Sequence, residues 1–110
     1  MYTASVKTPV TTTCQDVLLL IDRERVSIKK FGVREIGVFG SFARGDHKTS
    51  SDVDVLVDLA PGTNPFDDYM GLLFFLEDLF GRKADLVTKN SIKPLIKNRI
   101  LRETIYVPGF

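Results

Sequence analysis

Residues 40–58 read GSFARGDHKTSSDVDVLVD and contain the most specific pattern in the chain. A Gly-Ser pair, Gly40 and Ser41, opens it, and ten residues separate Ser41 from Asp52. Asp52 and Asp54 then lie one residue apart among valines. Because side chains alternate between the two faces of a strand, both carboxylates point the same way, roughly 6–7 Å apart along the strand. The stretch therefore predicts either a half-exposed strand with a polar face or a metal site beside a phosphate-binding turn.

The bulk composition bounds the alternatives. The chain has 110 residues, which is the length of one domain. It contains no apolar run near the roughly 20 residues of a membrane span, and its first residues lack the apolar core of a signal peptide. A single cysteine, Cys14, excludes an internal disulfide and a zinc site built from cysteine pairs. We expect a cytoplasmic protein with no membrane segment.

Charge is balanced overall but unevenly distributed along the chain. The net charge of +1 gives no electrostatic argument for nucleic-acid binding, so no direct nucleic-acid contact is expected. Residues 52–85 carry eight acids against two bases, whereas residues 86–104 carry five bases against one acid. This arrangement fits a cation site next to an anion-binding surface, and it equally fits two solvated helix faces.

The first half of the chain predicts an irregular segment over residues 1–12, followed by a domain over residues 13–110. Thr13 and Asp16 resemble a capping box before a helix over residues 14–30, which Gly32 ends. Further elements are a strand over 33–39, a helical turn over 41–44, a polar loop over 46–51 that includes a solvated His47, and a strand over 52–59.

The second half predicts an amphipathic helix over residues 64–80, a strand over 83–88, a last helix capped by Ser91 and a closing strand over 105–107. The apolar side of the first of these helices comprises Phe66, Tyr69, Met70, Leu73, Leu76 and Phe80. Phe74 and Phe75 cannot both face one core, which leaves a dimer or partner surface open. The order of elements predicts an α/β or α+β domain of two layers, with helices packed on one small mixed sheet.

The acidic residues suggest a chemistry. Two carboxylates held close together repel each other unless a cation compensates them, and Mg²⁺ prefers oxygen ligands of this kind. Asp85, in the segment KADLVT, brings a third carboxylate if its strand pairs beside that of Asp52 and Asp54. Three such acids can hold two Mg²⁺ ions for in-line phosphoryl or nucleotidyl transfer. Gly40, Ser41 and Arg44 could bind phosphate, although the Walker A sequence is absent.

The pattern of Gly-Ser, ten residues, Asp-x-Asp and a later acid resembles the signature of the minimal nucleotidyltransferase (MNT) family, within the DNA polymerase β-like nucleotidyltransferase superfamily. The resemblance covers about residues 33–107, and FFLEDLFGRKADLVT is similar to the segment that carries the family's third acid. It implies a nucleotidyltransferase fold, with Mg²⁺ ligands and catalytic acids at Asp52, Asp54 and Asp85. The implied nucleotide-binding residues are Gly40, Ser41, Arg44 and Ser51.

The resemblance also implies an activity and a partner. NMP, most simply AMP from ATP, would be attached to an acceptor hydroxyl with release of pyrophosphate. Many minimal members resemble antitoxins that silence a HEPN-domain toxin by attaching AMP to a tyrosine. Two alternatives stay open: a non-catalytic antitoxin that acts by complex formation, and an enzyme that modifies a small molecule. The sequence does not determine whether the chain forms a homo-oligomer.

Overall fold

The computed structural model describes residues 12–62 and 64–110. The irregular segment predicted over residues 1–12 therefore lies outside the described residues, apart from Thr12. Four strands form one mixed sheet in the order β3-β2-β1-β4, with β2 antiparallel to β1 and parallel to β3, and β4 antiparallel to β1. The strands are β1 (Val33–Phe39), β2 (Val53–Leu59), β3 (Ala84–Thr88) and β4 (Ile105–Tyr106).

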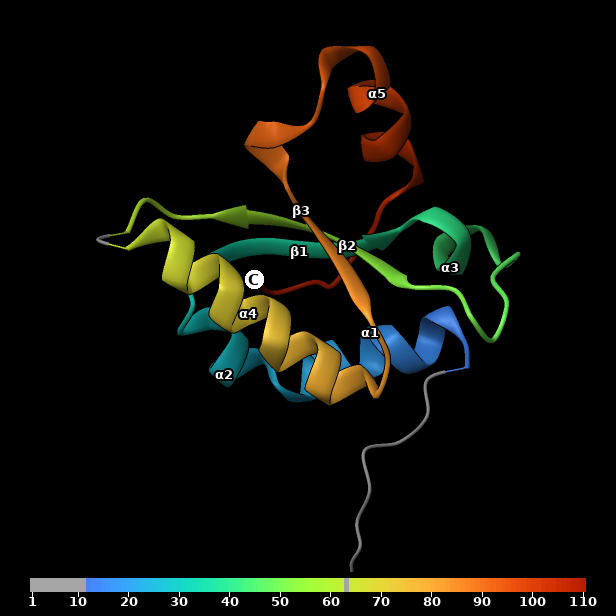
Figure 1. The fold of residues 1–110 in the computed structure, drawn as a ribbon, viewed down its shortest axis with the longest axis horizontal. Coiled ribbons are helices and arrows are strands. Elements are labelled where there is room, and N and C mark those ends of the chain that lie inside the picture. The colour runs from blue at the N-terminus through green and yellow to red at the C-terminus, as the bar shows by residue number, and fades with distance from the viewer. Residues whose placement is uncertain (1–11, 63) are drawn as a thin grey trace, which may run out of the picture.

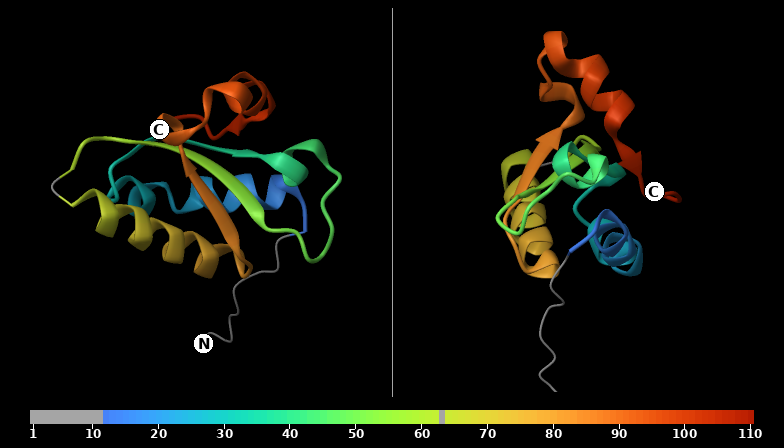
Figure 2. Two further views of the ribbon diagram at one scale, coloured as in Figure 1. Left: turned by 45° about the horizontal axis from the view of Figure 1, so that its top comes forward. Right: turned by 90° about the vertical axis from the view of Figure 1, so that its right-hand side faces the viewer.

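Helices cover both faces of this sheet (Figures 1 and 2). Three of them, α1 (Cys14–Arg23), α2 (Arg25–Lys29) and α4 (Pro65–Phe80), lie on one face. The other face carries α5 (Pro94–Glu103), which follows a short 3₁₀ turn, η1 (Lys89–Ser91). The short helix α3 (Gly40–Arg44) joins β1 to the loop before β2. The predicted mixed sheet flanked by helices is confirmed, but the domain has three layers rather than two.

The alternating side chains of β2 build both halves of the core. Val53, Val55 and Val57 are fully buried in the main core beneath α1 and α4. Leu56 faces the opposite way and is buried in a smaller core with Phe39, Ile92 and Ile100, on the α5 side of the sheet. Because β2 is hydrogen-bonded on both edges and covered on both faces, it is an internal strand of the sheet rather than a half-exposed one.

The predicted helix over residues 14–30 is interrupted. The Thr13–Asp16 capping box begins α1 as expected, but Glu24 adopts φ −101° and ψ 21°, which separates α1 from α2. Ile28 remains fully buried after this break, whereas Val26 is 71% exposed. Gly32 ends this region with a φ of 86°, in the left-handed range that favours glycine.

Two helix predictions were wrong in detail. The buried stripe of α4 is Leu72, Leu76 and Phe80, and Phe66 at its first turn is 71% exposed, so the buried face is rotated from the predicted one. Ser91 does not cap α5, because that helix begins at Pro94, whose fixed φ favours the first helical position. The Ser91 hydroxyl instead donates to the Thr88 carbonyl oxygen at 3.0 Å and closes the turn after β3.

Across the described residues, none of the helices combines the length and the apolar character needed to cross a membrane.

Candidate functional site

Asp54 and Asp85 lie side by side on neighbouring strands. Asp54 is on the central strand β2, and its register partner on the parallel strand β3 is Asp85. Register partners point to the same face of a sheet, so both carboxylates lie on the α5 side. Asp52 precedes β2 and is exposed, so it lies one residue outside the strand in which it was predicted. The predicted pairing of the two acidic strands is confirmed.

The Asp54 carboxyl group lies in an environment that disfavours its charge. Partial burial, together with the nearby charges of Asp85 and Asp52, raises its pKa to about 6, while Arg44 acts in the opposite direction. As they lie, no three histidine, cysteine or acidic side chains in residues 12–62 and 64–110 are gathered closely enough to hold a metal ion. The carboxylates of Asp52, Asp54 and Asp85 nevertheless offer only oxygen donors and carry mutually repelling negative charges. Such a set of donors suits a hard cation such as Mg²⁺.

Gly40 brings the backbone of the Gly-Ser turn against Asp54. Its φ is 73°, and a Cβ atom at this position would overlap the Asp54 carboxylate. Glycine is therefore required here both by the backbone conformation and by the close approach of a carboxylate. The turn and the acidic pair, separate features of the sequence, form one continuous surface.

Glu103 completes this surface, although the sequence analysis did not identify it. Its Oε2 accepts a hydrogen bond from the Gly40 amide at 2.7 Å, and its Oε1 accepts one from the Arg44 guanidinium at 2.9 Å. Arg44 also pairs through Nε with Asp46 at 3.2 Å. Glu103 lies 63 residues from Gly40, outside the motif, so local spacing carries no signal for this contact.

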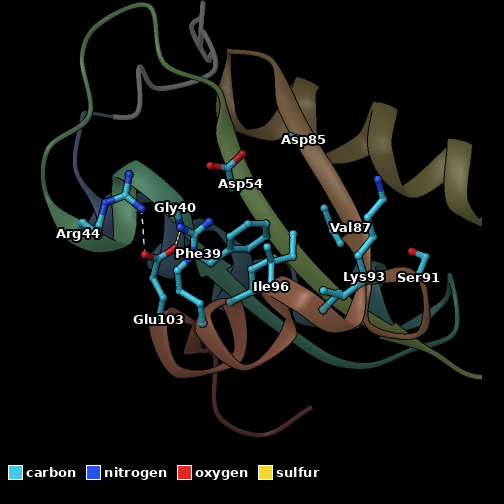
Figure 3. A pocket seen from close by; sticks show the side chains of 13 residues that line it. Phe39, Gly40, Arg44, Asp54, Asp85, Val87, Ser91, Lys93, Ile96 and Glu103 are labelled. Carbon is cyan, nitrogen blue, oxygen red and sulfur yellow. Dashed lines mark hydrogen bonds and ion pairs between the residues drawn. The ribbon is translucent and has the colours of Figure 1, made fainter.

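These groups line a cleft of about 540 Å³ between the sheet and α5 (Figure 3). Its lining includes three acids, Asp54, Asp85 and Glu103, together with Arg44. Apolar side chains from the smaller core and α5 also line it. The remaining lining residues are Phe39, Gly40, Val87, Ser91, Ile92, Lys93, Ile96, Arg99 and Ile100.

Four of the predicted site residues, Gly40, Arg44, Asp54 and Asp85, line this cleft. The other three, Ser41, Ser51 and Asp52, are not among its lining residues. The Ser51 hydroxyl instead accepts the Lys48 amide at 2.8 Å and so closes the loop that leads into β2.

An aromatic stack supports the loop between the Gly-Ser turn and Asp52. The buried Phe42 ring stacks on His47 with ring centroids 3.9 Å apart, and the Arg82 guanidinium lies 5.0 Å from the Phe42 centroid. Arg82 also donates to the Ser51 carbonyl oxygen at 2.8 Å. His47 was predicted to be solvated, but it is half-buried because it packs on Phe42.

Side chains from α4 fix the strand that carries Asp85. The Tyr69 hydroxyl donates to the Leu86 carbonyl oxygen at 2.5 Å, and Glu77 accepts the Ala84 amide at 3.1 Å. These backbone groups belong to the residues on either side of Asp85. Since β3 is an edge strand, the two contacts satisfy backbone groups that would otherwise lack partners at the sheet edge.

The chain is similar to known proteins in both sequence and structure. A family model described as a nucleotidyltransferase domain matches residues 22–107. The protein adenylyltransferase MntA of Thermococcus cleftensis is 48% identical over 85 residues, covering 72% of this chain and 79% of that protein. A solved structure described as a candidate minimal nucleotidyltransferase is 28% identical, with a TM-score of 0.76 over 88% of this chain and 98% of that one.

The chain also has a more distant structural similarity to one chain of a solved complex. Its description is a tri-AMPylated HEPN toxin of Shewanella oneidensis with an MNT antitoxin, and the matched chain is 17% identical with a TM-score of 0.59. The match covers 84% of this chain and 73% of that chain. At this identity the likeness shows a shared fold.

Proposed function

This chain belongs to the nucleotidyltransferase domain family, and from that premise we propose that it transfers AMP from ATP to a hydroxyl group of a partner protein. The observation that carries the proposal is the register pairing of Asp54 with Asp85, directly against the Gly40 turn. A phosphate-binding turn beside paired carboxylates is the arrangement that nucleotidyl transfer requires.

In this proposal, Asp52, Asp54 and Asp85 hold Mg²⁺. The raised pKa of Asp54, caused by partial burial and then by the neighbouring acids, supports a cation at this place. Bound Mg²⁺ would neutralise charge on the triphosphate and on the leaving pyrophosphate. The number of ions follows from the family resemblance, which implies two.

The protein side chains then position the reactants. Gly40, Ser41 and Arg44 hold the triphosphate, with Ser51 supporting the turn through its loop. The acceptor oxygen attacks the α-phosphorus, the bond from that phosphorus to the bridging oxygen of the β-phosphate breaks, and pyrophosphate leaves. Asp85 accepts the proton of the acceptor hydroxyl. Positioning and charge stabilisation supply most of the rate enhancement in such reactions.

The proposed acceptor is a tyrosine of a HEPN-family toxin, which makes the chain an antitoxin. Two descriptions support this choice: a relative with 48% identity is named a protein adenylyltransferase, and a chain of similar fold was solved with an AMPylated HEPN toxin. The alternatives are neutralisation by complex formation alone and modification of a small molecule. The acidic pair facing the cleft favours catalysis over a purely binding role.

The proposal is tested by transfer of label from α-³²P-ATP with Mg²⁺ in a lysate of the source cells. The wild-type protein should label one protein band, and Asp54→Asn should abolish the label. Asp78→Asn is the matched control, because Asp78 is exposed on α4, on the opposite side of the sheet from the cleft. Label on small molecules instead of on a protein would show that the chain modifies a small molecule. A stable complex without label, formed equally well by Asp54→Asn, would select the binding role.

A further inference from the structure

The carboxylate of Glu103 occupies the Gly-Ser turn in the way an anionic ligand would. It bridges the Gly40 amide and the Arg44 guanidinium at 2.7 and 2.9 Å, and its side chain is 18% exposed (Figure 3). Although burial opposes the effect, the hydrogen bonds from Arg44 and Gly40 hold the pKa of Glu103 below its usual value. Glu103 is therefore a charged internal ligand of the turn.

The same two donors are those that the proposed function assigns to the triphosphate. Carboxylate and phosphate oxygens are both anionic acceptors of charge-assisted hydrogen bonds, and both bind guanidinium groups with similar geometry. One backbone N–H directed at Glu103 is not available to a phosphate oxygen at the same time. The two anions also repel each other across the short distance of a shared donor.

We propose that Glu103 competes with the nucleotide: the triphosphate binds the turn by replacing the Glu103 carboxylate on Gly40 and Arg44. This inference rests on the proposed function, and it assigns to a residue outside the motif the role of setting nucleotide affinity. Because Glu103 is the last residue of α5, nucleotide binding would also release that end of the helix from the turn.

The released carboxylate has a second partner within reach. Arg99 lies one helical turn earlier on α5, lines the same cleft and interacts electrostatically with Glu103. Residues four apart on a helix are neighbours, so Glu103 can exchange Arg44 for Arg99 without unfolding α5. The exchange makes Nη1 of Arg44 available to phosphate oxygens, while its Nε keeps its pair with Asp46.

The test measures binding of two probes to the full-length chain with Mg²⁺: inorganic tripolyphosphate and α,β-methylene-ATP. Glu103→Gln keeps the shape of the side chain and removes its charge, so we expect the Kd for both probes to fall about tenfold. The Gly40 amide resonance should shift on addition of tripolyphosphate, and it should do so at lower concentration in the variant.

Two controls separate this effect from a general change in charge. Glu35→Gln removes a carboxylate that pairs with Lys89 at 2.9 Å and does not line the cleft, so Kd should change by less than about twofold. Asp46→Asn frees Arg44 from its exposed partner while leaving Glu103 on the turn, and it too should change Kd by less than about twofold.

An unchanged or weaker affinity of Glu103→Gln, in protein that retains its circular dichroism spectrum, would overturn the inference and make Glu103 a positioning residue. If Glu103→Gln does not fold, Glu103→Asp replaces it, because the shorter side chain cannot bridge both donors and should also tighten binding. Tighter tripolyphosphate binding without nucleotidyl transfer to any acceptor would instead contradict the proposed function and leave the competition intact.

Discussion

The α-carbon of Gly40 lies directly against the carboxylate of Asp54, so that no side chain fits between the Gly-Ser turn and the central acidic residue. The two residues are 14 positions apart in the sequence, and antiparallel pairing of β1 with β2 brings them together, since Phe39 is the register partner of Asp54. This contact makes the turn and the acidic pair a single site, which gives the first prediction.

Replacing Gly40 with alanine should destabilise the fold by about 1–3 kcal/mol and abolish nucleotidyl transfer, because the new Cβ needs a left-handed backbone and displaces Asp54. Gly45→Ala is the matched control: its φ is 83°, but a Cβ there meets open space. It should cost only the backbone strain, about 1 kcal/mol, and retain transfer. Urea denaturation and the label-transfer assay measure both effects. Equal loss of activity in the two variants would show that strain alone is responsible.

Replacing Asp54 with asparagine should stabilise the metal-free protein while abolishing activity. Partial burial, with Asp85 and Asp52 adding to it, raises the pKa of Asp54 from 3.8 to about 6 in the folded state. The stability associated with its neutral form is present below about pH 4 and lost as the pH rises through about 6. At pH 8 Asp54→Asn should therefore raise the free energy of unfolding by about 1–2 kcal/mol, after allowance for solvent screening.

The pH and metal dependence checks this interpretation. The gain from Asp54→Asn should disappear at pH 4, where the wild-type carboxyl group is already protonated. Mg²⁺ at pH 8 should raise the melting temperature of the wild-type protein and have little effect on the variant. A variant less stable than the wild type at pH 8 would contradict the assignment of Asp54 as an uncompensated charge.

The hydroxyl of Tyr69 should stabilise the strand that carries Asp85. Tyr69→Phe removes the donor to the Leu86 carbonyl oxygen and should lower the free energy of unfolding by about 1 kcal/mol. Amide hydrogen exchange in β3 should become faster. Tyr106→Phe, on the exposed strand β4, is the comparison and should have less effect. Unchanged exchange in β3 would show that pairing with β2 alone fixes this strand.

Much of the site could be predicted because its signals are local. Alternation along residues 52–59 places Asp54 opposite the buried valines, and the helix-then-strand order around Gly81 predicts a strand carrying Asp85. Glu103 could not be found in this way, because its contact with Gly40 depends on α5 folding back over the sheet. The three-layer arrangement was missed for the same reason, since the amphipathic pattern of a helix does not identify which face of a sheet it covers.

Arg82 should hold the loop between the Gly-Ser turn and Asp52 through its planar guanidinium rather than through its charge alone. The group lies over the buried Phe42 ring at 5.0 Å and donates to the Ser51 carbonyl oxygen at 2.8 Å. Lysine keeps the charge but lacks the planar group that stacks on an aromatic ring. Arg82→Lys should therefore lower the free energy of unfolding by about 0.5–1 kcal/mol.

Hydrogen exchange shows which segment of the chain Arg82→Lys destabilises. Amide exchange across residues 46–51 should accelerate in Arg82→Lys. Label transfer should also fall, even where the protein is still fully folded, because Asp52 follows the loop directly. Arg23→Lys, at an exposed position in the last turn of α1, is the matched control and should leave exchange in the loop unchanged. Unchanged exchange in Arg82→Lys would show that the stack of Phe42 on His47 is sufficient to order the loop.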